Sequence, residues 1–341
     1  MRIALDAMGT DRHPAIEVAG ALDALRDLPD DFELLLVGDQ ARIDAELAQH
    51  GQAPAGRLHV VHAEETIAPG EPAVSAVRRK RKSSIAIGLG LQKEQQADAF
   101  VSAGSTGAVM AASLFLLGPV PGVDRPAIAT PLPTSTEPML LIDAGANVDT
   151  RPQHLVQFAR LAAIYVEDVW QRATPRIGLL NIGEEPEKGD ERSVEAHQLL
   201  AASDLNFIGN VEGRDVIRGV CDVLVSDGFC GNVLLKFYES IMAFMHGLLE
   251  REFAAAGVDL DLDRLLRAFD YTEYGGAPLL GVNGVSIICH GGSPPRAIAN
   301  AIRVARQAVQ TKMVGHIARE VTAHEGEARA AARSAAEGKS A

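Results

Sequence analysis

Short apolar runs alternate with helical patterns along most of this chain, and that alternation limits the folds open to it. The runs are about five residues long, and stretches with apolar residues at helical spacing separate them. Strands connected through helices pair in parallel, so the pattern predicts a mostly parallel sheet covered by helices on both faces. The predicted strands are Arg2–Leu5, Glu33–Val37, Arg57–Val61, Ala99–Ser102, Ala127–Thr130, Met139–Ile142, Ile177–Asn181, Asn206–Gly209, Val223–Ser226 and Val285–Cys289.

The alternation continues without an internal repeat or a long Gly/Ser linker. We therefore expect a single α/β unit over residues 1–322, of the three-layer α/β/α class. A helical excursion is expected at about 229–273. The remaining residues, 323–341, have the composition of a helical or disordered tail outside the core.

Charge and cysteine usage exclude several classes of protein. A net charge of −13 with one Trp and four Tyr disfavours a nucleic-acid partner, which needs basic patches and stacking platforms. No window of 18 residues is apolar throughout, so we expect no membrane span. Cys221, Cys230 and Cys289 are odd in number and lack CxxC spacing, which favours reduced thiols in a cytoplasm. No His, Asp or Glu set has metal-ligand spacing.

Polar loops that combine Gly with Asp, Asn or Ser follow five of the predicted strands. Open α/β sheets bind ligands beyond the carboxyl ends of their strands, so the loops favour a shared ligand cleft. The alternative is that loops simply favour these residue types. The five loops are Asp6–Asp11, Ser102–Gly107, Ala144–Asp149, Asn181–Gly189 and Ser226–Asn232.

The loop chemistry suits an anion. Gly104–Gly107 precedes a helix, whose first N–H groups would point at bound phosphate. The chain lacks the GxSxG, GxGxxG and P-loop patterns in the required contexts. Lys188 is either a phosphate partner or a solvated loop lysine. His290 is either a group for proton transfer or a capped, satisfied side chain.

Two further features have more than one interpretation. Arg78–Lys82 is the densest basic run in an acidic protein; it is either a solvated helix end or a docking site for an acidic carrier protein or phosphate groups. The helix that begins near Phe229 carries apolar residues at helical spacing, which favours core or dimer packing over membrane contact.

The predicted site residues lie in or next to these loops, in the segment after the last predicted strand and in the basic run. The predicted catalytic residues are Lys188, Asn147 and His290. The residues expected to bind substrate or phosphate are Gly104, Ser105, Thr106, Gly107, Asp143, Asp227 and Asn232. The residues expected to dock the carrier are Arg78, Arg79, Lys80, Arg81 and Lys82. No metal ligand is predicted.

Eight motifs, in order over about residues 1–315, resemble the bacterial phosphate acyltransferases of the PlsX family. They are LDAMG at 5–9, VSAGSTGA at 101–108, DRPAIATPLP at 124–133, LIDAGANVD at 141–149, LLNIGEEPEKG at 179–189, FIGNVEGRD at 207–215, DVLVSDGFCGNVLLK at 222–236 and YGGAPLLG at 274–281.

This resemblance implies transfer of a fatty acyl group from acyl carrier protein to inorganic phosphate, for phospholipid synthesis. It implies a homodimer, a fold similar to isocitrate and isopropylmalate dehydrogenases, and no cofactor. The acyl phosphate would pass to a membrane glycerol-3-phosphate acyltransferase. Two alternatives remain: a phosphotransacetylase-like transfer from acyl-coenzyme A to phosphate, and an inactive scaffold that binds the carrier.

The chain departs from the family pattern at four loop positions. Thr10 replaces a glycine, so we expect it to need a conformation that glycine takes freely. Arg12 adds a charge near the expected phosphate site, and Ser105 and Cys230 replace the usual Asn and Thr. Residues 240–273 are shorter and more acidic than the basic hairpin of family members. We expect a cytoplasmic protein, with peripheral contact at the membrane left open.

Overall fold

An 11-stranded sheet runs through the protein in the order β3-β2-β1-β4-β11-β10-β5-β6-β9-β7-β8. The computed structural model describes residues 1–50, 56–258, 261–262 and 273–323. The strands are β1 (Arg2–Asp6), β2 (Glu33–Gly38), β3 (Leu58–His62), β4 (Ala99–Ser102), β5 (Ala127–Leu132), β6 (Met139–Ile142), β7 (Ile177–Asn181), β8 (Phe207–Glu212), β9 (Val223–Val225), β10 (Ala277–Leu280) and β11 (Val285–Ile288). The helices are α1 (Ala15–Asp27), α2 (Gln40–His50), α3 (Ala73–Arg79), α4 (Ser84–Lys93), α5 (Thr106–Leu116), α6 (Pro152–Asp168), α7 (Glu191–Ala201), the short 3-10 helix η1 (Gly213–Arg218), α8 (Gly228–Ala256) and α10 (Pro295–Gln310).

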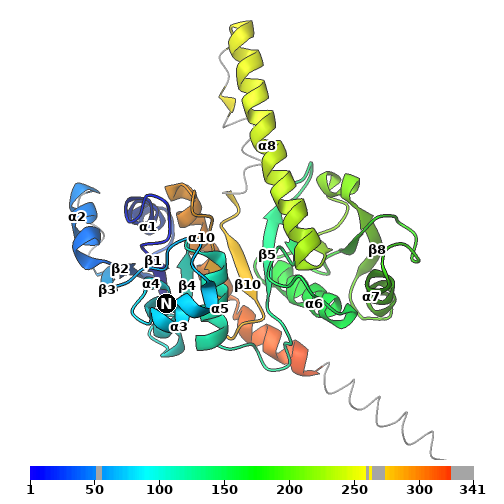
Figure 1. Cartoon of the computed structure of the whole chain (residues 1–341), viewed down its shortest axis with the longest axis horizontal. Coiled ribbons are helices and arrows are strands. Elements are labelled where there is room, and N and C mark those ends of the chain that lie inside the picture. The colour runs from blue at the N-terminus through cyan, green and yellow to red at the C-terminus, as the bar shows by residue number, and fades with distance from the viewer. Residues whose placement is uncertain (51–55, 259–260, 263–272, 324–341) are drawn as a thin grey trace, which may run out of the picture.

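Strand direction divides the sheet into two parallel blocks. One block contains β3, β2, β1, β4 and β11, and the other contains β6, β9, β7 and β8. Between them, β10 is antiparallel to both β11 and β5, and β5 is antiparallel to β6. Figure 1 shows β10 and β5 between the two groups of helices. The predicted mostly parallel sheet is confirmed, whereas the alternation did not predict the reversal at its centre.

Two hydrophobic cores lie on opposite faces of this sheet. Alternate side chains of a strand point to opposite faces, and in β1 Ile3 and Leu5 join one core while Ala4 joins the other. The first core receives the apolar sides of α1, α6 and α10, and the second receives those of α3, α4 and α5. The three-layer α/β/α arrangement predicted from the sequence is therefore confirmed.

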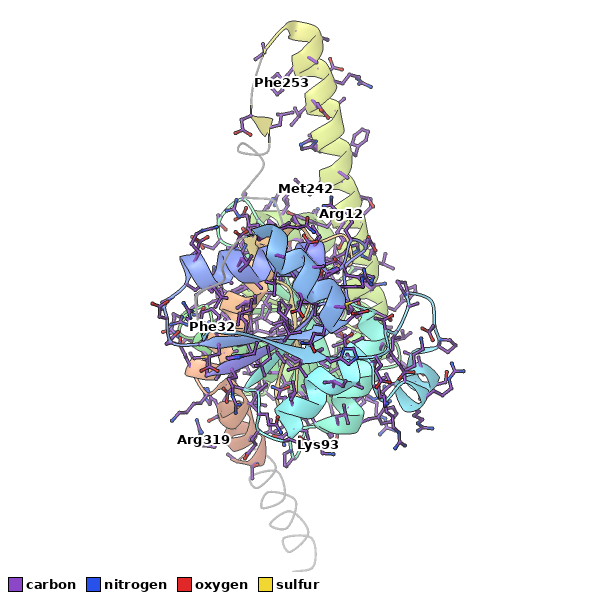
Figure 2. The ribbon with its side chains drawn as sticks, turned by 90° about the vertical axis from the view of Figure 1, so that its left-hand side faces the viewer. Arg12, Phe32, Lys93, Met242, Phe253 and Arg319 are labelled. Carbon is purple, nitrogen blue, oxygen red and sulfur yellow. The ribbon has the colours of Figure 1, made fainter. Side chains whose placement is uncertain are left out.

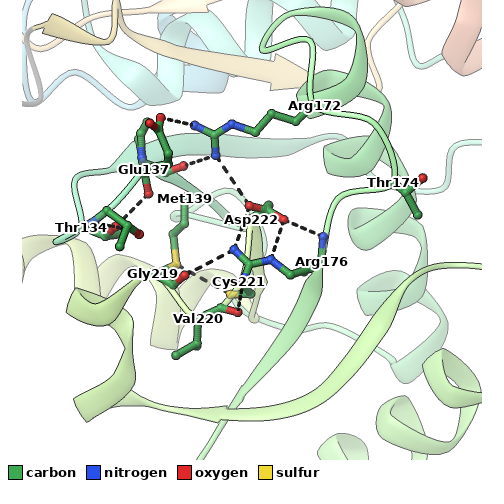
Figure 3. Close-up of polar contacts among 12 residues, drawn as sticks. Thr134, Glu137, Met139, Arg172, Thr174, Arg176, Gly219, Val220, Cys221 and Asp222 are labelled. Carbon is green, nitrogen blue, oxygen red and sulfur yellow. Dashed lines mark hydrogen bonds and ion pairs between the residues drawn. The ribbon is translucent and has the colours of Figure 1, made fainter.

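A cluster of ion pairs holds the start of the second block (Figure 3). Asp222, just before β9, accepts hydrogen bonds from the backbone N–H of Arg176 at 2.8 Å and from its guanidinium at 3.0 and 3.1 Å. Arg172 lies 3.7 Å from the same carboxylate and 3.0 Å from Glu137, which precedes β6. These contacts join the amino ends of β6, β7 and β9, so the carboxyl ends are left for other contacts.

Helix α8 is 29 residues long and projects from the rest of the described chain (Figure 1). Figure 2 labels Met242 and Phe253 on this projecting part. The predicted excursion at 229–273 therefore begins as a helix, but 259–260 and 263–272 lie outside the described residues, as does nearly all of the predicted tail. Among the described helices, none combines the length and apolarity needed to cross a membrane.

Candidate active site

A pocket with a volume of about 270 Å³ lies where the two parallel blocks meet. Its walls come from the loops after β6 and β11, from β5, from the start of β10, and from the first turns of α5, α8 and α10. The lining residues are Thr106, Ile128, Thr130, Pro131, Ala144, Gly145, Asn232, Leu235, Lys236, Glu239, Gly276, Ala277, Ile288, Cys289, His290, Ser293 and Ala297. Of the residues predicted to be catalytic or to bind substrate, the pocket brings together Thr106, Asn232 and His290.

The loop after β6 is organised by the buried carboxylate of Asp143. Its Oδ1 accepts hydrogen bonds from the backbone N–H groups of Ile128, Gly145 and Ala146 at 2.9–3.1 Å. Its Oδ2 accepts from the backbone N–H of Asn147 at 2.7 Å and from the Asn147 side chain at 2.9 Å. Burial raises the pKa of Asp143, and these donors oppose that rise.

The Asn147 side chain also makes its hydrogen bonds to backbone and side-chain groups that hold this loop. Its side-chain Nδ2 donates to the carbonyl oxygen of Pro126 at 2.8 Å, in addition to Asp143. Its carbonyl oxygen accepts from the backbone N–H of Gly228 at the start of α8. Asp143 and Asn147 therefore hold the loop in shape, and neither lines the pocket.

Two glycines bring the start of α8 against that loop. A Cβ on Gly228 would lie 2.8 Å from the backbone N and O of Asn147, and one on Gly231 would lie 2.0 Å from the carbonyl oxygen of Asp143. Asp227 caps the helix by accepting from the N–H groups of residues 229 and 230, and it is paired with Arg192 at 2.9 Å. This packing directs Asn232 into the pocket next to Gly145, where a Cβ on the glycine would lie 3.5 Å from the Asn232 side chain.

The same face of α8 carries a cation and an anion. Lys236 and Glu239 line the pocket with Asn232, and the Lys236 ammonium donates to the Glu239 carboxylate at 2.8 Å. Lys236 was not among the site residues predicted from the sequence. The helical spacing could have predicted it, because residues three or four positions apart share one helix face, and residues 232, 236 and 239 have that spacing.

The loop after β4 supplies a helix N-terminus. Ser102 Oγ donates to Asp6 at 2.7 Å and accepts from the N–H of Gly104 at 3.0 Å. Ser105 precedes α5 but makes no capping hydrogen bond with its side chain, and Thr106 begins the helix at the pocket wall. The first N–H groups of an α-helix have no intrahelical partner and favour an anion. Gly107 lies against α3, on the side of Ala73.

The first loop is held by Glu17, which is buried on α1. Its carboxylate accepts from the N–H groups of Gly9 at 3.1 Å and Thr10 at 2.6 Å, and from the Thr10 hydroxyl at 3.0 Å. Thr10 has no positive φ, so the expectation that it needs a glycine-like conformation is wrong. Its hydroxyl instead adds a bond that glycine could not make. Burial raises the pKa of Glu17 to about 7.

The loop after β11 completes the pocket. His290 is exposed, and its Nδ1 accepts from the N–H of Gly292 at 3.1 Å. The carbonyl oxygen of Gly291 accepts from the N–H of Asp11, so the first loop supports this one. Burial raises the pKa of the Cys289 thiol to about 12, and a protonated thiol is a poor nucleophile.

Lys188 lies apart from the pocket lining. It is exposed, and its backbone carbonyl accepts from the side chain of Asn181 at 2.9 Å, which fixes the loop after β7. The basic run lies on α3 and on the turn before α4, also outside the lining. Within the described part of the chain, no group of three or more His, Cys, Asp or Glu side chains could hold a metal ion.

Comparison with known proteins gives one family match and several relatives. A family model described as "Fatty acid synthesis protein" matches residues 1–316. A phosphate acyltransferase from Desulforamulus reducens is 49% identical over 321 residues, which are 92% of this chain and 95% of that protein. One from Heliobacterium modesticaldum is 49% identical over 326 residues, 93% of this chain and 96% of that protein. The solved phosphotransacetylase from Streptococcus pyogenes matches with a TM-score of 0.61 at 18% identity. The match covers 91% of this chain and 94% of that chain, and at this identity it shows only that the two proteins share a fold.

Proposed function

Since this chain belongs to the phosphate acyltransferase (PlsX) family and is an acyltransferase, we propose that it forms acyl phosphate from a fatty acyl-acyl carrier protein and inorganic phosphate. One observation carries this proposal: the N-terminus of α5 and the Lys236 ammonium line the same pocket, whose other walls are largely apolar. The helix N-terminus suits phosphate, the Lys236 ammonium would join it by exchanging Glu239 for the ligand, and the apolar walls suit an acyl thioester.

The chemistry needs positioning more than acid–base catalysis. A phosphate oxygen attacks the thioester carbonyl carbon and forms a C–O bond, while the C–S bond breaks. The electron pair leaves on sulfur, and the proton of hydrogen phosphate ends on the thiol of the carrier's arm. N–H groups at the start of α5 and the amide of Asn232 are our candidates for donors to the carbonyl oxygen as it becomes negative. His290 is our candidate for proton transfer.

The proposal assigns no covalent intermediate to the enzyme. Cys289 is the cysteine in the pocket lining, and its raised pKa keeps it protonated at neutral pH. Direct attack by phosphate therefore fits this pocket better than transfer through a cysteine thioester. The product is a mixed anhydride, and its proposed consumer is a membrane glycerol-3-phosphate acyltransferase.

The test mixes the protein, a long-chain acyl-acyl carrier protein and phosphate, and measures acyl phosphate. We expect product that depends on phosphate, and a higher kcat/KM with the carrier-linked donor than with the coenzyme-A-linked donor. Preference for coenzyme A would favour the phosphotransacetylase-like alternative. Carrier binding without any turnover by folded protein would favour the inactive scaffold.

We expect Lys236→Met to raise the KM for phosphate about tenfold or more, because a hydrogen bond from a charged donor is worth about 1.5–3 kcal/mol. Glu239→Gln is the matched variant: it releases the ammonium from its 2.8 Å partner, so the KM for phosphate should fall or stay constant. Lys188→Met tests the position predicted from the sequence. If Lys188→Met raises this KM and Lys236→Met does not, phosphate binds at the loop after β7 instead of in the pocket.

We also propose a homodimer that covers part of α8. Val233, Phe237 and Phe244 are 54%, 63% and 67% exposed, and their spacing puts them on one helix face, away from the face that lines the pocket. Burial of such a face is favourable by roughly 25 cal/mol per Å² of apolar surface. Sedimentation equilibrium should give a dimer for the wild type and mostly monomer for Phe237→Glu. A wild-type monomer at micromolar concentration would refute this.

A further inference from the structure

Two of the five residues in the basic run Arg78–Lys82 already have acidic partners. The Lys80 ammonium lies 2.6 Å from the Glu71 carboxylate and donates to the carbonyl oxygen of Thr66 at 2.8 Å. The Lys82 ammonium lies 2.9 Å from both oxygens of Glu64. These two lysines therefore tie the run to the chain before α3, and their charges are largely neutralised.

The three arginines of the run differ from the lysines. Arg78, Arg79 and Arg81 are exposed, and none makes an ion pair with a residue that the structure describes. The Arg78 guanidinium lies over the ring of Phe115, 5.1 Å from its centre, and Arg79 Nε donates to a backbone carbonyl one turn earlier. In a chain of net charge −13, the run thus presents three guanidinium groups to a partner.

An apolar hollow lies beside these guanidinium groups. Val74 is 49% exposed and Phe115 is 47% exposed, so both present apolar surface next to the arginines. The hollow is lined by Pro72, Ala73, Val74, Ser75, Arg78 and Arg79. Arginine next to exposed aromatic and aliphatic side chains is the composition of a protein-binding surface.

This surface is joined to the pocket by direct packing. α3 packs on α5, and a Cβ on Gly107 would lie 3.3 Å from the Cβ of Ala73, the first residue of α3. Thr106, the neighbour of Gly107, lines the pocket. At 1.5 Å per residue, Arg79 is about 9 Å along the helix axis from Ala73. A partner bound over the arginines would therefore stand beside the pocket wall.

Resting on the proposed function, we infer that Arg78, Arg79 and Arg81, together with Val74 and Phe115, form the surface that docks the acyl carrier protein. The occupant is an acidic protein domain that presents carboxylates to the guanidinium groups and an apolar side chain to the hollow. Lys80 and Lys82 hold the run in place and contribute little to binding. An anionic membrane is less favoured, because it would offer no single side chain to fill the hollow lined by Val74, Arg78 and Arg79.

The test is steady-state kinetics with the acyl-carrier donor varied at saturating phosphate. For the triple variant Arg78→Glu/Arg79→Glu/Arg81→Glu we expect at least a tenfold higher KM for the carrier, with kcat within about twofold. The KM for phosphate and for a coenzyme-A-linked acyl donor should not change. Raising the salt concentration should raise the carrier KM of the wild type and leave that of the triple variant nearly constant.

Matched variants separate docking from general effects of charge. Lys82→Gln removes a charge that is already paired, so it should raise the carrier KM far less than the triple variant does. Arg319→Glu reverses an exposed arginine at the C-terminal end of the described chain (Figure 2) and should keep the wild-type KM. An unchanged carrier KM in the triple variant would overturn the docking surface and leave the proposed function standing. An equal rise in the KM for the coenzyme-A-linked donor would also overturn it. So would a triple variant that loses binding to anionic vesicles but keeps its binding to the carrier.

Failure of the proposed function would give a different result, namely no acyl phosphate from the wild type. If the wild type makes no acyl phosphate, carrier binding is measured directly by calorimetric titration with the wild type and the triple variant. Tenfold weaker binding by the triple variant would support the docking surface even then. Equal binding by both proteins would overturn it.

Discussion

Gly231→Ala is expected to lower the free energy of unfolding by about 3 kcal/mol or more and to abolish acyl transfer. The added Cβ would lie 2.0 Å from the carbonyl oxygen of Asp143 and 2.7 Å from the hydroxyl oxygen of Ser226. Both neighbours belong to the ends of central strands, so the start of α8 has to move instead. That shift displaces Asn232 and Lys236 from the pocket. Urea unfolding and initial rates on the folded variant measure the two effects.

Gly247→Ala is the control for this substitution. Gly247 lies on the projecting part of α8, and a Cβ there would meet nothing within 4 Å. Alanine is favoured over glycine in an exposed helix by about 1 kcal/mol, so this variant should be as stable as the wild type or slightly more stable, with full activity. Equal stability of the two alanine variants would show that the contact between α8 and the loop after β6 tolerates a methyl group.

Glu17→Gln is expected to remove a pH-dependent contribution of about 3 kcal/mol to the free energy of unfolding. The pKa of Glu17 rises from its ordinary value of 4.5 to about 7 on folding, chiefly through burial, with a smaller contribution from the nearby charge of Asp6. The folded protein therefore binds more protons than the unfolded chain between these values. This contribution to stability is fully present below pH 4.5 and is lost as the pH rises through 7.

Glutamine keeps an oxygen that accepts from the N–H groups of Gly9 and Thr10, but it does not titrate. Urea unfolding of both proteins at several values between about pH 4.5 and 8 measures the effect. The stability of the wild type relative to Glu17→Gln should fall by about 3 kcal/mol over that range. Asp143, whose pKa burial also raises, is present in both proteins and cancels in the difference. Parallel stability curves would contradict this prediction.

Most of the sheet was predictable from the sequence because its strands are apolar and regularly spaced. Arg2–Leu5, Ala99–Ser102, Met139–Ile142 and Ile177–Asn181 all match observed strands to within a residue. β10 was missed because Pro278 lacks a backbone donor, and proline argues against a central strand. The strand nevertheless pairs on both sides, with β11 and β5. Without β10, the alternation gives no sign that strand direction reverses.

The site was predictable to the level of loops but not of side chains. Asp143 and Asn147 have the residue types of a binding loop, yet their polar atoms hold that loop together. Whether a polar group faces a ligand or its own backbone depends on contacts that spacing does not encode. Glu17 looked like an ordinary helix residue, because its partners, Gly9 and Thr10, precede it in a loop of unknown shape.

The order of strands in the sheet also decides the order in which a growing chain can fold. The block β6-β9-β7-β8 is built from residues 139–212 and 223–225, which emerge from the ribosome as one continuous stretch. The other block begins with β1 but is completed by β11, which pairs with β4 across more than 180 residues, and α10 then covers α1. The second block of the sheet can therefore form during synthesis, whereas the first waits for nearly the whole chain.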